Sequence, residues 1–254
     1  MDRPAPPLSV VVPAYNEAGA IRAGRLGAVI AWRDAHRPDA EIVVVDDGSP
    51  DDTAAAAREA LAGDAGRVLT IPHGGKAAAV AAGFRAARGD VVLFTDMDLA
   101  TPIADADGLL RALAGGADVA IGSRGLYRAG APPGRLVLST GQVLLRVLLL
   151  GMPLRDTQCG FKAFRRDVAL DLLDRLRVYS PDRAAPDGPS VTSGFDVELL
   201  FVARRRGYRV DEVPVRWHYA DSSRVSLRRD ARRGVLDLLR IARARLRRDY
   251  GPRV

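Results

Sequence analysis

The stretch Leu8-Ser-Val-Val-Val-Pro-Ala-Tyr-Asn-Glu17 contains a run of β-branched valines, Val10 to Val12, and ends in polar residues. The same order returns in Glu41-Ile-Val-Val-Val-Asp-Asp-Gly-Ser49 and in Val91-Val-Leu-Phe-Thr-Asp-Met-Asp98. Short unbroken apolar runs are typical of strands that are covered on both faces, and helical segments separate them here. The sequence therefore predicts an α/β protein with a mostly parallel sheet and helices on both faces.

The rest of the chain continues this alternation less regularly. Strands are expected over 8–13, 41–46, 67–71, 91–95, 117–121 and 208–217, and helices over 18–35, 53–61, 76–88, 105–114, 137–150, 165–176, 195–206 and 230–250. Residues 125–134 and 180–193 are rich in Gly, Pro, Asp or Ser and are expected to be loops. The second of these is long enough to predict a mobile lid.

Composition excludes several classes of protein. With 254 residues and 48% hydrophobic residues, the chain is neither wholly disordered nor fibrous. Its single cysteine, Cys159, excludes an internal disulfide and a cysteine-based zinc site.

The positive charge is concentrated at one end of the chain. The net charge is +7, yet residues 224–254 hold eleven arginines against three acidic residues, a balance of +8 that leaves −1 for residues 1–223. We therefore expect a nearly neutral domain over 1–223 and a basic helical tail over 224–254.

The basic tail allows three interpretations: it binds nucleic acid, lies on an anionic membrane, or is simply solvated. Apolar residues recur between its arginines near helical spacing, which favours an amphipathic helix at a membrane surface. Tyr250 is a weak sign of base stacking, so nucleic acid is not the expected partner. Residues 136–154 are apolar but contain Arg146 and helix breakers, which predicts an interfacial or buried helix rather than a span. Met1–Pro7 lacks the pattern of a secretory signal.

Polar groups follow the expected strands at four places, near Glu17, Asp47, Asp98 and Arg124. In an open α/β sheet, ligands bind beyond the carboxyl ends of the strands, so these groups should share one site. The side chains of Asp96 and Asp98, two residues apart, are expected to project from the same side of an extended segment, so they can share one divalent cation. Because Mg²⁺ takes few protein carboxylates together with phosphate oxygens, this pair suits a diphosphate ligand.

These motifs resemble the GT-A domain of glycosyltransferase family 2, a Rossmann-like fold. The order and spacing of 9–17, 43–49 and 96–98 carry the resemblance to the superfamily. Arg155-Asp-Thr-Gln-Cys-Gly-Phe-Lys162, Phe195-Asp-Val-Glu-Leu-Leu200 and Trp217 with Ser223-Arg224 resemble the dolichyl-phosphate (polyprenyl-phosphate) β-glucosyltransferases and the related mannosyltransferases. The resemblance extends from about residue 8 to residue 246.

The resemblance implies roles for individual residues. Those that would bind the nucleotide of the donor are Pro13, Tyr15, Glu17, Val45 and Asp47, with Val45 and Asp47 contacting the base and ribose. Asp96 and Asp98 would hold Mg²⁺ or Mn²⁺ on the diphosphate, with Met97 between them in the donor site. Arg124 would reach a phosphate at the active centre, and Arg224 would close over the phosphates where relatives often carry Ser-Lys.

Two further residues are assigned from their own chemistry. Lys76 follows Gly74-Gly75 at the start of an expected helix, so its ammonium and the nearby amides can face an anionic oxygen. Asp156 is a candidate base or an orienting group, and orientation is favoured because a lipid phosphate is already ionised. Cys159 is interpreted as a small buried residue rather than a nucleophile.

The function that the resemblance implies is inverting transfer of a hexose, glucose from UDP-glucose, to a polyprenyl or dolichyl phosphate. The alternatives are a donor such as GDP-mannose or UDP-N-acetylglucosamine, and a nucleic-acid-binding protein that functions through its tail. The enzyme is expected to be metal-dependent and peripheral, at the cytoplasmic face of an anionic membrane. The sequence leaves the oligomeric state open.

Overall fold

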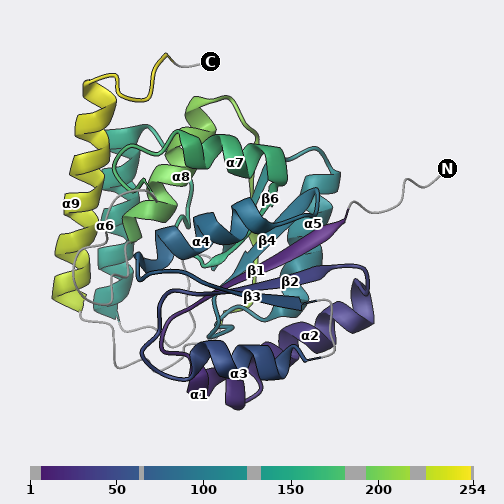
Figure 1. Cartoon of the computed structure of the whole chain (residues 1–254). Coiled ribbons are helices and arrows are strands. Elements are labelled where there is room, and N and C mark those ends of the chain that lie inside the picture. The colour runs from purple at the N-terminus through teal and green to yellow at the C-terminus, as the bar shows by residue number, and fades with distance from the viewer. Residues whose placement is uncertain (1–6, 63–65, 125–132, 181–192, 218–226, 253–254) are drawn as a thin grey trace.

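A seven-stranded sheet forms the centre of the computed structural model, which describes residues 7–62, 66–124, 133–180, 193–217 and 227–252 (Figure 1). Its strands are β1 (Leu8–Ala14), β2 (Glu41–Asp46), β3 (Gly66–Thr70), β4 (Val91–Thr95), β5 (Val119–Ser123), β6 (Phe161–Arg165) and β7 (Val210–Pro214). They lie in the order β3-β2-β1-β4-β6-β5-β7. All neighbouring pairs are parallel except those that involve β6, which confirms the mostly parallel sheet.

Helices cover both faces of the sheet, as the unbroken apolar strands predict. One face packs against α4 (Gly75–Ala86), α7 (Arg166–Asp174) and α8 (Ser193–Arg205). The other packs against α1 (Ala18–Arg22), α2 (Arg25–His36), α3 (Thr53–Ala60), a short 3₁₀ turn (Ile103–Asp105) and α5 (Ala106–Ala114). Two hydrophobic cores result, one on each side of the strands (Figure 1).

One strand was not expected from the sequence. Residues 161–165 form β6, which runs antiparallel between β4 and β5 and pairs Phe94 with Lys162. The sequence does not predict this strand, because Phe161-Lys-Ala-Phe-Arg165 contains two charged residues. In the structure its first four residues are nevertheless buried. Because β6 is antiparallel, the segment before it lies at the same edge as the carboxyl ends of β4 and β5.

The prediction of one continuous helix over 18–35 is also wrong. Two helices, α1 and α2, replace it, and Gly24 between them has a left-handed backbone with φ of 87°. Glycine adopts this conformation without the steric cost that other residues incur, which explains the break.

The last helix packs on the rest of the molecule rather than standing apart. α9 (Leu227–Leu246) lies beside α6 (Pro133–Leu150) and contacts α8 (Figure 1). Its buried residues Leu238, Ile241 and Ala242 belong to the same core as α4, α7 and α8. Neither α6 nor any other described helix has the length and hydropathy needed to cross a membrane.

Candidate functional site

The four sequence motifs meet at one edge of the sheet. β1, β2, β4, β5 and β7 end there, and the segment 155–160 enters β6 from the same edge. Backbone amides of one loop bind side chains of the next: Asn16 N donates to Ser49 Oγ at 3.0 Å, and Glu17 N donates to Thr53 Oγ1 at 2.8 Å. Loops that follow separate strands are therefore tied into one surface.

The proposed metal ligands Asp96 and Asp98 follow β4, with Met97 buried between them. The Asp96 carboxylate forms an ion pair with Lys76, whose Nζ lies 2.8 Å from Oδ1 and 3.1 Å from Oδ2. Asp98 is exposed, and its Oδ1 accepts the Ala100 amide at 3.0 Å. No cluster of three or more His, Cys, Asp or Glu ligands occurs among the described residues. Two carboxylate ligands fit a hard cation that takes its remaining ligands from water and a diphosphate.

The charges at this point are strongly coupled. Burial raises the pKa of Asp96 above its usual value against the opposing effect of Lys76, and the nearby charges of Asp98 and Asp196 raise it further. Burial alone would lower the pKa of Lys76, but the carboxylates of Asp96, Asp196 and Asp98 hold it above its usual value. Lys76 is therefore a fixed positive charge, and the site carries an excess of carboxylates that favours a divalent cation.

Gly160 lies directly against the Asp96 carboxylate. Its carbonyl accepts the Asp96 amide at 3.1 Å, and a Cβ on this residue would stand 1.7 Å from Asp96 Oδ2. Only glycine leaves room for the carboxylate in this position. The segment before β6 thus determines where Asp96 lies.

Asp47 is buried at the N-terminus of α4. Its Oδ1 accepts the Gly74 amide at 2.8 Å, its Oδ2 accepts the Gly75 amide at 2.9 Å, and His73 Nδ1 lies 2.9 Å from Oδ2. The His73 ring stacks on Tyr15 with a centroid separation of 4.4 Å. The amides that the sequence offers to a ligand phosphate therefore bind Asp47 in this structure.

The other residues assigned to nucleotide binding lie at the same edge. Pro13 and Glu17 are half-buried near the end of β1. Val45 is wholly buried in β2, where a Cβ on Gly83 of α4 would lie 3.2 Å from its Cγ2.

Arg124 and Asp156 form a two-pronged ion pair. Arg124 Nε and Nη2 donate to Asp156 Oδ2 and Oδ1 at 2.6 and 2.8 Å, and the Arg124 amide donates to Oδ2 at 3.1 Å. The guanidinium also faces the Trp217 ring at 5.8 Å from its centroid. Burial alone would lower the pKa of Arg124, but the ion pair with Asp156 raises it. Both carboxylate oxygens bind Arg124, an arrangement that suits an orienting group.

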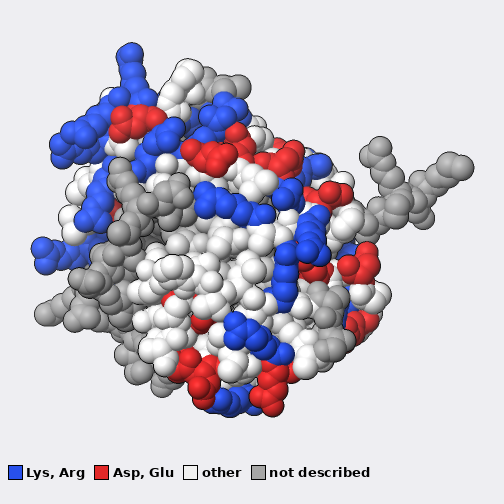
Figure 2. Space-filling model, in the orientation of Figure 1, with Lys and Arg blue, Asp and Glu red and all other residues white. Residues whose placement is uncertain are grey.

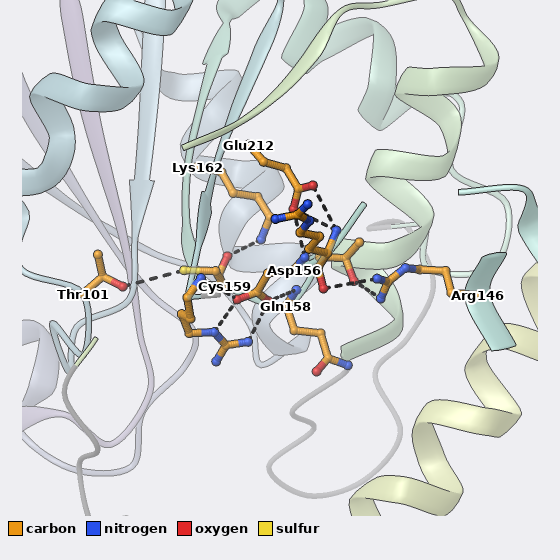
Figure 3. A network of polar contacts seen from close by, with 10 residues as sticks. Thr101, Arg146, Asp156, Gln158, Cys159, Lys162 and Glu212 are labelled. Carbon is orange, nitrogen blue, oxygen red and sulfur yellow. Dashed lines mark hydrogen bonds and ion pairs between the residues drawn. The ribbon is translucent and has the colours of Figure 1, made fainter. Parts of the chain in front are cut away.

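The loop that carries Asp156 is held from two sides (Figure 3). Glu212 on β7 accepts the Arg155 amide at 2.8 Å and the Asp156 amide at 3.0 Å. Arg146 on α6 is buried and donates to Thr157 Oγ1 at 3.0 Å and to the Leu154 carbonyl. In the sequence Arg146 is only a charge that argues against a span; in the structure it fixes the Asp156 loop.

Cys159 is buried and free, which confirms its interpretation as a small buried residue. Its Sγ lies 3.7 Å from Thr101 Oγ1 (Figure 3). Burial raises the pKa of the thiol, and the charge of Asp156 raises it further. The thiol therefore stays protonated and is a poor nucleophile.

Part of the predicted site lies outside the described residues. Arg224 falls within 218–226, and most of the expected loops 125–134 and 180–193 also fall outside. Lys76 and Lys162, the two lysines of the chain, both fall within motifs, and this favours a function for each of them. The sequence assigns no role in the site to Asp196, Glu212 or Arg146. Lys162 and Asp196 lie within motifs quoted from the sequence, but nothing local indicates that they pair.

The chain is similar to known glycosyltransferases along most of its length. The sequence model described as "Glycosyl transferase family 2" matches residues 9–173. Dolichyl-phosphate beta-glucosyltransferase from Saccharomyces cerevisiae is 31% identical, in a match that covers 94% of this chain and 75% of that protein. The Drosophila melanogaster protein of the same name is 36% identical over 243 residues, which cover 89% of this chain and 71% of that protein.

A solved structure has the same fold. Glucosyl-3-phosphoglycerate synthase from Mycobacterium tuberculosis, in complex with Mn²⁺, uridine-diphosphate and glucosyl-3-phosphoglycerate, matches with a TM-score of 0.63 at 24% identity. The match covers 93% of this chain and 80% of that one. At this level of identity the likeness establishes the fold.

Proposed function

The chain belongs to glycosyltransferase family 2 and has the GT-A fold, and from this premise we propose that it transfers glucose from UDP-glucose to a polyprenyl phosphate with inversion. The observation that carries the proposal is the meeting of Asp96, Asp98 and Arg124 at one sheet edge. An acidic pair for a cation and an arginine for a phosphate suit a reaction between a nucleotide diphosphate and a lipid phosphate.

The proposed step is a displacement at the anomeric carbon. An oxygen of the lipid phosphate forms the new bond, and the bond from the anomeric carbon to the UDP oxygen breaks, with the electron pair leaving on UDP. A phosphate monoester has its second pKa near 6, so the nucleophile is ionised at neutral pH and requires no base. Asp156 therefore serves to hold Arg124, whose charge stabilises a phosphate during transfer.

Asp96 and Asp98 would hold Mg²⁺ or Mn²⁺, which neutralises charge on the departing diphosphate when it is bound. Lys76 forms an ion pair with Asp96 and, as a fixed cation, can also bind an oxygen of the diphosphate. Pro13, Tyr15, Glu17, Val45 and Asp47 are proposed to form the nucleotide pocket. Arg224 is proposed to close over the phosphates.

The same proposal includes contact with an anionic membrane through α6 and α9. All large apolar side chains that are exposed among the described residues belong to these two helices: Leu144, Val147, Leu148, Val235, Leu236, Leu239 and Leu246. Arginines of α9 gather along the same edge of the molecule (Figure 2). Each basic residue near an anionic leaflet contributes about 1 kcal/mol, so several would retain the protein beside its lipid acceptor.

A transfer assay with lipid extraction tests the proposed reaction. UDP-glucose, GDP-mannose and UDP-N-acetylglucosamine would compete as labelled donors for a polyprenyl phosphate, with Mn²⁺ or with EDTA. We expect label from UDP-glucose in the lipid phase, a loss with EDTA, and a loss in a folded Asp98→Ala variant. Turnover by that variant in EDTA would refute the metal role. Transfer from GDP-mannose alone would show that GDP-mannose, and not UDP-glucose, is the donor.

A further inference from the structure

A buried pair of charges lies behind the proposed metal site. Lys162 on β6 is fully buried, and its Nζ donates to Asp196 Oδ1 at 2.6 Å and to the Cys159 carbonyl. Asp196 stands in the first turn of α8 and is itself buried. A buried ion pair is costly to desolvate, and an apolar pair of similar volume often serves stability as well or better. Stability alone therefore gives a weak reason for these two charges.

The hydrogen bonds of Lys162 lead directly to Asp96. Lys162 holds the Cys159 carbonyl, and the next carbonyl, that of Gly160, accepts the Asp96 amide at 3.1 Å. The Asp96 carboxylate occupies the space beside Gly160, because a Cβ added to this glycine would stand 1.7 Å from Oδ2. A shift of the turn at residues 159 and 160 would therefore displace the carboxylate. Figure 3 shows Lys162 reaching the Cys159 backbone beside the Asp156 loop.

The pair also belongs to the same electrostatic group as the site. Both lysines lie near one aromatic ring, with Lys76 Nζ 5.0 Å and Lys162 Nζ 5.8 Å from the Phe94 centroid. The charge of Asp196 acts on Lys76 as well as on Lys162. Three carboxylates, of Asp96, Asp98 and Asp196, and the two ammonium groups of Lys76 and Lys162 thus form one electrostatic group.

We propose that Lys162, held by Asp196, is a positioning residue that fixes the turn at Cys159 and Gly160 and so sets the Asp96 carboxylate for the divalent cation. The inference rests on the proposed function, since it takes Asp96 as a ligand of that cation. A purely stabilising pair and a positioning pair make different predictions. Replacing both charges with apolar side chains restores stability in either case, but it restores metal binding only if the pair has no positioning role.

The experiment compares melting temperature with the dissociation constant for Mn²⁺ in the presence of UDP, measured by calorimetry. The variants are Lys162→Met, Asp196→Asn and the double variant Lys162→Met/Asp196→Leu. The matched control is Glu198→Gln on the same helix, because Glu198 is also fully buried and binds the backbone amides of Arg177, Val178 and Tyr179. Its Oε1 also accepts the Tyr250 hydroxyl at 2.6 Å, and none of these partners belongs to the Asp96 group.

We expect both single variants to melt earlier and to bind Mn²⁺ about tenfold more weakly, which corresponds to about 1.4 kcal/mol. The double variant should regain thermal stability while its Mn²⁺ affinity stays weak, and Glu198→Gln should melt earlier with wild-type affinity. A double variant with wild-type affinity, or equal weakening by Glu198→Gln, would overturn the inference. If Lys162→Met does not fold, Asp196→Asn carries the test, and wild-type affinity in that variant would overturn the inference as well. Absence of Mn²⁺ binding by the wild-type protein with UDP would instead refute the metal site of the proposed function.

Discussion

Replacing Gly160 with alanine should move the Asp96 carboxylate with little other change. The added Cβ would stand 1.7 Å from Asp96 Oδ2, 2.3 Å from Cγ and 2.9 Å from Oδ1. Restoring a contact of 3.0 Å requires the nearest oxygen to retreat by about 1.3 Å. Gly160 does not have a left-handed backbone, so the substitution acts through the methyl group rather than through backbone strain.

The size of the expected effect follows from this displacement. Misplacing a group by about 1 Å in an active site can cost roughly a hundredfold in rate, or about 2.7 kcal/mol of transition-state stabilisation. Overpacking of this kind also costs about 1–3 kcal/mol of stability, which lowers the Tm of a chain of this size by several degrees. We therefore expect Gly160→Ala to fold, to melt somewhat earlier and to lose about a hundredfold in kcat/KM.

Steady-state transfer rates and calorimetric titration with Mn²⁺ and UDP would measure these losses. Gly27→Ala on α2 is the matched control, because nothing lies within 4 Å of the added methyl group. That control should keep full activity and gain slightly in stability, as alanine favours a helix over glycine. Wild-type activity and Mn²⁺ affinity in Gly160→Ala would refute the reasoning that Gly160 sets the position of Asp96.

Three further predictions concern other parts of the molecule. Asp156→Asn should lower kcat about a hundredfold without changing the shape of the pH–rate profile, because Asp156 orients Arg124; a lost alkaline or acidic limb would indicate a base instead. Burial and Glu198 raise the pKa of Tyr250, so above pH 10 the unfolded chain loses a proton that the folded chain keeps, and stability falls with rising pH. Urea unfolding at pH 9 and 11 should show a loss smaller by about 1.4 kcal/mol in Tyr250→Phe than in the wild type, and equal losses would contradict this assignment. The double variant Leu239→Glu/Leu246→Glu should sediment less with phosphatidylserine vesicles, whereas Arg58→Glu on α3 should sediment like the wild type. Equal binding by the wild type and both variants would exclude the exposed apolar face of α9 as the membrane contact.

The sequence predicts the edge of the sheet more reliably than it predicts the contacts at that edge. Strands β1, β2 and β4 are unbroken apolar runs, and a parallel sheet brings the residues after them together whatever their side chains do. The positions of Asp47 and Asp96 could therefore be anticipated. Their partners could not, because Asp47 binds Gly74 and Gly75 at a distance of 27 and 28 residues along the chain.

Strand β6 was missed for a related reason. Lys162 makes Phe161-Lys-Ala-Phe-Arg165 look amphipathic, while in the structure its charge is balanced by Asp196, 34 residues later. A local pattern cannot show whether a charge will find a partner that the fold supplies. The motif 155–162 is nevertheless informative, because one short segment carries Asp156, which holds Arg124, and Gly160, which adjoins Asp96.

The basic tail is explained by two different faces of α9. Where burial is described along this helix, at Arg232, Arg233, Arg240, Arg243 and Arg245, the arginines are exposed. Leu238, Ile241 and Ala242 are instead buried against the core that α8 helps to form. Deleting residues 224–254 would remove the charge and also uncover that core, so the loss of membrane binding after truncation would not separate the two effects. Because Leu239 and Leu246 are exposed on the same helix, substitutions at those positions test the membrane face while leaving the buried side chains in place.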